Sequence, residues 1–136
     1  MSLDVHIQAN PGPPRVGGAH KFVCAFDDNG YYWFLYPLFE RLAEETGQWI
    51  DLYDGAVFGG ETLDALARTL ASARSLVEVQ PAVWEVISGI RSVPVPVPEE
   101  VRCRIEKAKM IALLDGLEAG VRRARETGTY ITFFGD

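Results

Sequence analysis

The chain has 136 residues, of which 48% are hydrophobic, and a formal net charge of −6 at pH 7. This length and composition suit one globular domain over residues 1–136, and they exclude a disordered or fibrous chain. No apolar run approaches the roughly 20 residues that a membrane-spanning helix needs. The first residues lack the basic start and apolar stretch of a signal peptide, so we expect a cytoplasmic protein without a membrane partner.

The negative charge is concentrated in the first half of the chain. Residues 1–65 hold ten acids and three bases, whereas residues 66–136 hold nine acids and ten bases. A nucleic-acid partner needs a basic footprint, so we expect none. The acidic half predicts instead a cationic protein partner, whose approach its field would speed. The alternative is that the charge only keeps a small domain soluble.

The first two predicted elements are strands. Residues 3–9 alternate apolar and polar side chains, which is the period of a half-buried strand. A loop rich in proline and glycine follows, and residues 21–26 suit a second strand. We therefore expect the chain to open with two antiparallel strands joined by a long loop.

Six of the nine residues 31–39 are aromatic, out of 15 aromatic residues in the whole chain. The Asn-Gly pair just before them is a hairpin signal, which would make residues 31–36 a strand. The competing pattern is a helix, because apolar residues recur at i, i+4 and i+7 and Gly47 supplies a stop. We favour the helix, over about residues 33–46, with Pro37 in its first turns.

Four elements are predicted in the middle of the chain. Residues 48–53 alternate like a strand, and residues 56–58 suit a short further strand after an Asp-Gly turn. Residues 63–77 carry the clearest helical face, with apolar residues three and four apart until Pro81 ends the pattern. Residues 83–90 are again strand-like.

The end of the chain predicts a connector, a helix and a strand. Residues 92–98 suit an extended connector, because three prolines remove backbone N–H groups. Pro98 and the two glutamates after it suit the start of a helix that runs to about Glu126. Residues 130–134 suit a closing strand. Together these elements predict an α+β fold: a mixed, mainly antiparallel sheet of about five strands, with three helices packed largely on one face.

Small residues recur at every fourth position of this last helix, at Ala108, Ala112, Gly116, Gly120 and Ala124. An interior glycine costs roughly 1 kcal/mol relative to alanine, which close packing against another backbone would offset. We expect this stripe to pack against the sheet. A contact between two copies of the chain is the alternative.

Motifs that carry chemistry are scarce in this sequence. Cys24 and Cys103 suit free thiols, and with two histidines they match no metal-ligand spacing. The Asp-Asp-Asn-Gly run at residues 27–30 lacks the spacing of a calcium loop, and the glycine pairs lack a phosphate-loop or dinucleotide pattern. We therefore expect no catalytic residues, no metal and no cofactor, and we favour a protein that is not an enzyme.

The candidate binding site combines the aromatic block with nearby acids. Aromatic side chains beside uncompensated carboxylates suit a recognition surface or a corner of the core. The candidate residues are Asp27, Asp28, Tyr31, Tyr32, Trp33, Tyr36, Asp51, Tyr53 and Asp54. At the level of class, a small acidic domain of this composition suits a bacterial immunity or inhibitor protein, which masks a cationic toxin by charge and aromatic contact.

Two other functions stay open. The segment from Trp49 to Glu61 places three carboxylates around a turn. A buried pair of them would support acid–base chemistry in an enzyme, or would line a cleft for a small ligand. A structural homodimer, built on the last helix or on an edge strand, is the third hypothesis.

Overall fold

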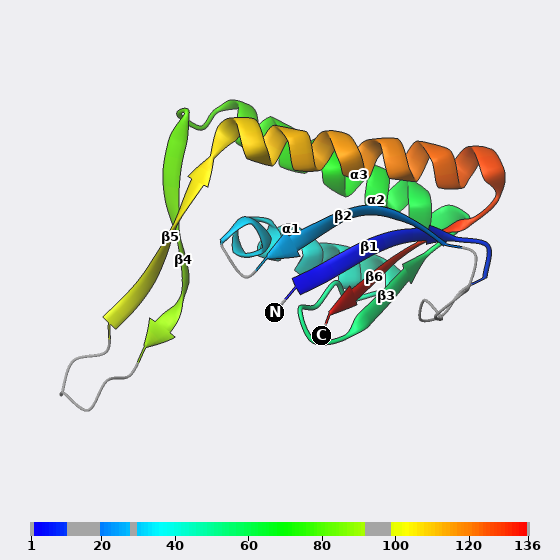
Figure 1. The fold of residues 1–136 in the computed structure, drawn as a ribbon, viewed down its shortest axis with the longest axis horizontal. Coiled ribbons are helices and arrows are strands. Elements are labelled where there is room, and N and C mark those ends of the chain that lie inside the picture. The colour runs from blue at the N-terminus through cyan, green and yellow to red at the C-terminus, as the bar shows by residue number, and fades with distance from the viewer. Residues whose placement is uncertain (1, 11–19, 28–29, 92–98, 136) are drawn as a thin grey trace.

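The structure is a computed structural model that describes residues 2–10, 20–27, 30–91 and 99–135. These residues form three helices and six strands (Figure 1). The strands are β1 (Ser2–Gln8), β2 (His20–Asp27), β3 (Gly55–Phe58), β4 (Val83–Arg91), β5 (Glu99–Glu106) and β6 (Tyr130–Gly135), and the helices are α1 (Tyr31–Thr46), α2 (Glu61–Glu78) and α3 (Lys107–Thr127). The predicted α+β class and the three helices are confirmed.

The strands form two separate antiparallel sheets. Four of them pair in the order β2-β1-β6-β3, so the first and last strands of the chain are neighbours at the centre. β4 and β5 form a two-stranded hairpin, which projects from the body beside the start of α3 (Figure 1). We predicted one sheet of about five strands, whereas the described residues hold six strands in two sheets.

The core lies between the four-stranded sheet and the helices. In β1, Leu3 and Val5 are fully buried, while Asp4 and His6 are half-exposed, so one face of the sheet is covered and the other is open. In Figure 1, α1 and α2 lie behind the sheet and α3 runs along its β2 side. Among the helices of the described chain, none has both the length and the apolar character that crossing a membrane requires.

Helix α1 begins two residues before its predicted start. Gly30 precedes it with a φ of 95°, a left-handed conformation that glycine adopts readily. A Cβ at Gly30 would lie 2.5 Å from the Cβ of Cys103, so the hairpin packs directly on the start of α1. Pro37 therefore falls in the second turn, where it removes the N–H that would bond to the Trp33 carbonyl. The predicted helix is confirmed, and the alternative strand over residues 31–36 is wrong.

The strand predicted over residues 48–53 is wrong. Ile50 and Leu52 are buried, which explains the apolar alternation, but the segment is a loop that joins neither described sheet. Its backbone forms hydrogen bonds with side chains and not with a neighbouring strand. The Tyr32 hydroxyl donates a hydrogen bond to the Ile50 carbonyl at 2.8 Å. Alternation in this segment therefore marks burial and not sheet pairing.

The helix predicted from Pro98 begins about nine residues later, and β5 occupies its expected first turns. Apolar and charged residues alternate in β5, and this period of two outweighs the helix-start signal of its glutamates. Ile105 is fully buried and Cys103 contacts the start of α1, so one face of the hairpin belongs to the core. The connector predicted over residues 92–98 lies outside the described residues.

The remaining predicted elements are confirmed, with boundaries that shift by one or two residues. They are the strands at residues 3–9, 21–26, 56–58, 83–90 and 130–134 and the helix at residues 63–77. The clearest apolar periods are those of residues 3–9 and 63–77, whose apolar positions are mostly buried. These predictions are confirmed where the local sequence pattern agrees with the burial of the residues in the fold.

Candidate functional site

The aromatic block of α1 lies partly in the core and partly at the surface. Tyr32 is 2% exposed and contacts Trp33 and Tyr36, and Tyr36 in turn contacts Trp49; these three residues are half-buried. Ring centroids lie 5.2 Å apart for Tyr32–Trp33, 5.6 Å for Trp33–Tyr36 and 5.4 Å for Tyr36–Trp49. We call these four residues the aromatic cluster. Three of its rings remain partly accessible to solvent, as a binding surface requires.

Tyr32 anchors the aromatic cluster to the core. Its hydroxyl donates to a buried carbonyl, that of Ile50. Burial raises the pKa of Tyr32, and the negative charge of Asp51 adds to this effect. The phenol therefore stays neutral and keeps its donor. Because the central ring is fixed in this way, Trp33 and Tyr36, which pack against it, are held in place before any partner arrives.

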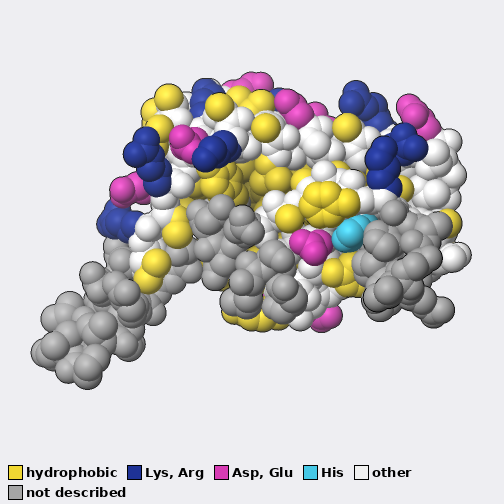
Figure 2. Space-filling view, viewed as in Figure 1, with side chains coloured by type: hydrophobic (Ala, Val, Ile, Leu, Met, Phe, Trp, Pro, Cys, Tyr) yellow, Lys and Arg dark blue, Asp and Glu magenta, His cyan; other side chains and the backbone are white. Residues whose placement is uncertain are grey.

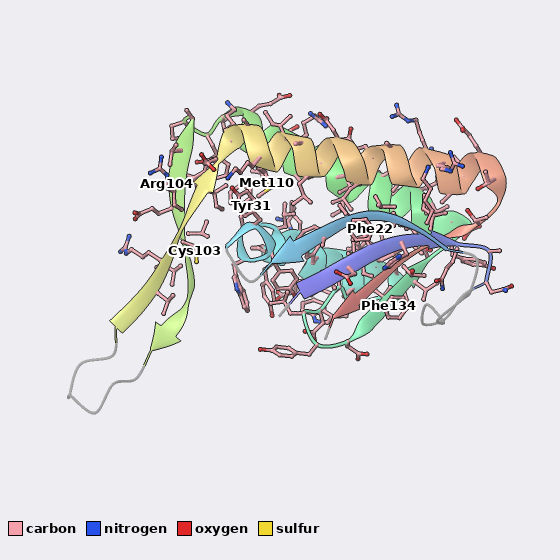
Figure 3. All side chains as sticks on the ribbon, in the orientation of Figure 1. Phe22, Tyr31, Cys103, Arg104, Met110 and Phe134 are labelled. Atoms are coloured by element: carbon pink, nitrogen blue, oxygen red, sulfur yellow. The ribbon has the colours of Figure 1, made fainter. Side chains whose placement is uncertain are left out.

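Tyr31 points away from the aromatic cluster and has a structural role. Its hydroxyl accepts a hydrogen bond from the Glu106 N–H at 3.1 Å, at the end of the hairpin. Figure 3 shows Tyr31 near Cys103 and Met110, where α1, β5 and α3 meet. Beside them, the rings of Phe34 and Trp84 lie 5.1 Å apart. This contact region joins the hairpin to the body.

The loop after α1 presents Tyr53 to solvent. The Tyr53 ring is 66% exposed, while its N–H donates to the Asp51 carboxylate at 3.0 Å. Asp54 holds the next turn, because its carboxylate accepts from the Gly55 N–H at 2.7 Å and its carbonyl from the Gly135 N–H at 2.9 Å. The loop is thus tied to the end of β6. Its two acids serve as turn residues as well as surface charge.

Two groups can be distinguished among the acids of the first half of the chain, those that form ion pairs and those that do not. Glu45 pairs with Arg68 of α2, and Asp64 pairs with Arg125 of α3 at 2.6 Å, so these carboxylates connect helices. A second group of acids lies near the aromatic cluster and forms no ion pair within the described residues. Its members are Glu40, Glu44, Asp51 and Asp54. Of the two other candidate acids, Asp27 ends β2 and Asp28 lies outside the described residues.

Sequence reasoning missed two parts of this surface. Trp49 was not among the candidate residues, although it follows α1 closely enough to fold back on it. Glu40 lies four residues after Tyr36, so the two share one face of the helix, and it is exposed. Four-residue spacing along α1 is the signal that would have added Glu40 to the site.

The carboxylates between Trp49 and Glu61 show no buried pair. Asp54 and Glu61 are exposed, and Asp51 is bonded to the backbone of its own loop. Within the described residues, no three or more His, Cys, Asp or Glu side chains are grouped so that they could hold a metal ion. Burial raises the pKa of the Cys24 thiol to about 12, which makes it a poor nucleophile at neutral pH.

The small-residue stripe of α3 divides into a packed part and an open part. Gly120 is buried, and a Cβ there would lie 3.2 Å from the side chains of Val23 and Ile131. Gly116 has no neighbouring atom within 4 Å of such a Cβ. The expected close packing is therefore confirmed at Gly120 and wrong at Gly116. An interior glycine lowers helix stability by roughly 1 kcal/mol relative to alanine, and packing offsets this cost at Gly120 but not at Gly116.

Comparison of the chain with protein-family models, with curated proteins and with solved structures finds no match. The most developed surface of the chain is the aromatic cluster, together with the loop that carries Tyr53 and the unpaired acids around them.

Proposed function

We propose that this chain is a small acidic protein-binding domain of the immunity or inhibitor kind, which acts in the cytoplasm and masks a cationic partner protein. The observation that carries the proposal is the aromatic cluster, in which Trp33 and Tyr36 pack on the buried Tyr32 and Trp49 packs on Tyr36. Aromatic residues dominate the binding energy of many interfaces, since they bury a large area with few rotatable bonds.

The charge around the aromatic cluster supports a cationic partner. Glu40, Glu44, Asp51 and Asp54 lie on α1 and on the loop that follows it, and Arg41 is the base among them. None of these four acids is neutralised by an ion pair within the described residues. Complementary charge raises association rates about tenfold or more, and salt screens it over about 10 Å at 0.1 M.

Rigid support also favours this surface over the rest of the chain. The aromatic cluster is fixed by the bond from Tyr32 to the Ile50 carbonyl, and the loop is fixed by Asp51 and Asp54. A surface that is ordered before binding loses less conformational entropy when the partner docks. Tyr53 then serves as an exposed ring at the rim.

Capture of a partner at low and high salt tests this proposal. The product of the neighbouring reading frame is the first protein to try, because an immunity protein is normally encoded beside its toxin. We expect a cationic protein to be retained at low salt and released at high salt. Tyr53→Ser should weaken the binding, since it removes an exposed ring without touching the core.

Val79→Ser is the matched control, because Val79 is 79% exposed at the end of α2 and is not part of the aromatic cluster. It should bind the partner as the unmodified chain does. An anionic partner, a salt-insensitive complex, or equal binding by the Tyr53→Ser variant would contradict the proposal.

A further inference from the structure

A groove lies between the first half of β2 and the second half of α3. It has a volume of about 410 Å³, within the range of roughly 300–1,000 Å³ that small-molecule sites occupy. Lys21 and Phe22 line it from the strand, and Gly116, Arg122 and Arg123 line it from the helix. Figure 2 shows basic side chains gathered at the end of the molecule where α3 finishes. We call this feature the α3 groove.

Two local features open the α3 groove. The pairing of β1 with β2 shifts register between Val5 and His6, which leaves Val23 as the extra residue of a bulge. Val23 packs against Gly120, so the strand and the helix touch at that point. At Gly116 they do not touch, and the absence of a side chain leaves the helix backbone accessible. Glycine is suited to a position where a ligand approaches the backbone closely.

In the described part of the chain, the α3 groove carries more basic than acidic side chains. Within the described residues, Lys21, Arg122 and Arg123 form no ion pair, and one acid, Glu126, lines the groove with them. Three other arginines on the helices are paired, Arg68 with Glu45, Arg74 with Asp115 and Glu118, and Arg125 with Asp64. Three like charges around one cavity repel one another, and a bound anion would relieve that repulsion.

We propose that the α3 groove binds a small organic anion. Its carboxylate or phosphate group contacts Lys21, Arg122 and Arg123, and an apolar part lies over Gly116 against the ring of Phe22, which is 56% exposed. A peptide strand added to β2 is a poorer occupant, because a bulge and a lysine are features that protect sheet edges from pairing. This inference does not depend on the proposed protein-binding function.

Titrations followed through backbone amide resonances test the proposal with three probes that share one ring. Phenyl phosphate and phenylacetate carry the two anionic groups, and benzyl alcohol is neutral. We expect saturable shifts at Val23, Gly116 and Gly120 with at least one anion and none with benzyl alcohol. Saturation by phenyl phosphate alone assigns a phosphate ligand, and saturation by phenylacetate alone assigns a carboxylate.

Three variants separate the groove from general charge. Arg122→Gln combined with Arg123→Gln removes the anion contacts, and Gly116→Leu fills the open space while keeping a good helix former. Each should weaken binding at least tenfold. Arg41→Gln, an exposed base on α1, should leave the affinity unchanged. The proposal is overturned by absence of saturation with both anions, by equal shifts with benzyl alcohol, by unchanged affinity in the double variant, or by an equal loss with Arg41→Gln.

Discussion

The aromatic cluster and the α3 groove are joined to the core in different ways. In the aromatic cluster, Trp33 and Tyr36 pack on the buried Tyr32 and Trp49 packs on Tyr36, so recognition and stability share the same side chains. In the α3 groove, the side chains of Arg122 and Arg123 are exposed and form no ion pair within the described residues. Substitutions in the groove should therefore change binding alone, while those in the cluster should change folding as well.

The largest effect is expected at the centre of the aromatic cluster. Tyr32→Ala should lower the free energy of unfolding by about 3–5 kcal/mol, because it removes a buried ring and leaves a cavity. Tyr32→Phe, which deletes only the hydroxyl, should cost about 1–3 kcal/mol by leaving the Ile50 carbonyl without its donor. Chemical denaturation measures both. A loss below about 1 kcal/mol for Tyr32→Ala would show that the cluster is not anchored in the core.

The packed part of the α3 stripe should show the next largest effect. Gly120→Leu should cost about 1–3 kcal/mol, because the new side chain would collide with Val23 and Ile131. The better helix propensity of leucine does not compensate for this collision. The denaturation midpoint is the measurement, and an unchanged or higher midpoint would mean that α3 does not lie against the sheet at this position.

The open part of the same stripe should respond with the opposite sign. Gly116→Ala should raise the free energy of unfolding by up to about 1 kcal/mol, since alanine is a better helix former and its Cβ meets open space. The same denaturation series provides the comparison with Gly120. Destabilisation by Gly116→Ala would place an unseen contact in the α3 groove and would weaken the contrast between the two glycines.

The smallest stability effect is expected at the rim of the aromatic surface. Tyr53→Ala should change the free energy of unfolding by no more than about 0.5 kcal/mol, because the ring is 66% exposed. Thermal or chemical denaturation checks this. A larger loss would mean that Tyr53 belongs to the core, and a loss of partner binding in that variant would no longer report on recognition alone.

The fold was predictable wherever a local pattern agreed with the final burial. Residues 63–77 have an apolar period that matches the buried face of α2, and Leu3, Val5 and Ile7 alternate along the covered face of β1; both elements are confirmed. Residues 48–53 alternate because Ile50 and Leu52 enter the core, yet nothing in the alternation shows whether a neighbouring strand is present. Pairing depends on distant residues, so this error has a physical cause.

The predicted start of the last helix was wrong for a different reason. Pro98 and two glutamates are sound signals for a helix N-terminus, but β5 carries an alternating pattern that finds a partner in β4. Packing of Cys103 against Gly30, across more than 70 positions of sequence, adds a contact that no local rule contains. Tertiary contacts thus outweighed a local propensity.

The sequence predicts which kinds of residue make up the candidate site, but not how their side chains are arranged. Six aromatics within residues 31–39 identify an unusual segment, but their helical geometry decides which ring is buried. Tyr31 turns to the hairpin, Tyr32 enters the core, and Trp33 and Tyr36 stay accessible. The α3 groove had no sequence signal, because Lys21 and Arg122 are brought together only by the packing of α3 beside β2.

Site-specific photocrosslinking tests the central claim most directly. A photoreactive phenylalanine placed at Tyr53 reports on the aromatic surface, and the same residue at Val79 reports on an exposed position that is not part of it. The account predicts that, at low salt in the source cell, a cationic protein is crosslinked from position 53 and not from position 79. Crosslinking of that protein from position 79 alone, or of an anionic protein from position 53, would contradict it.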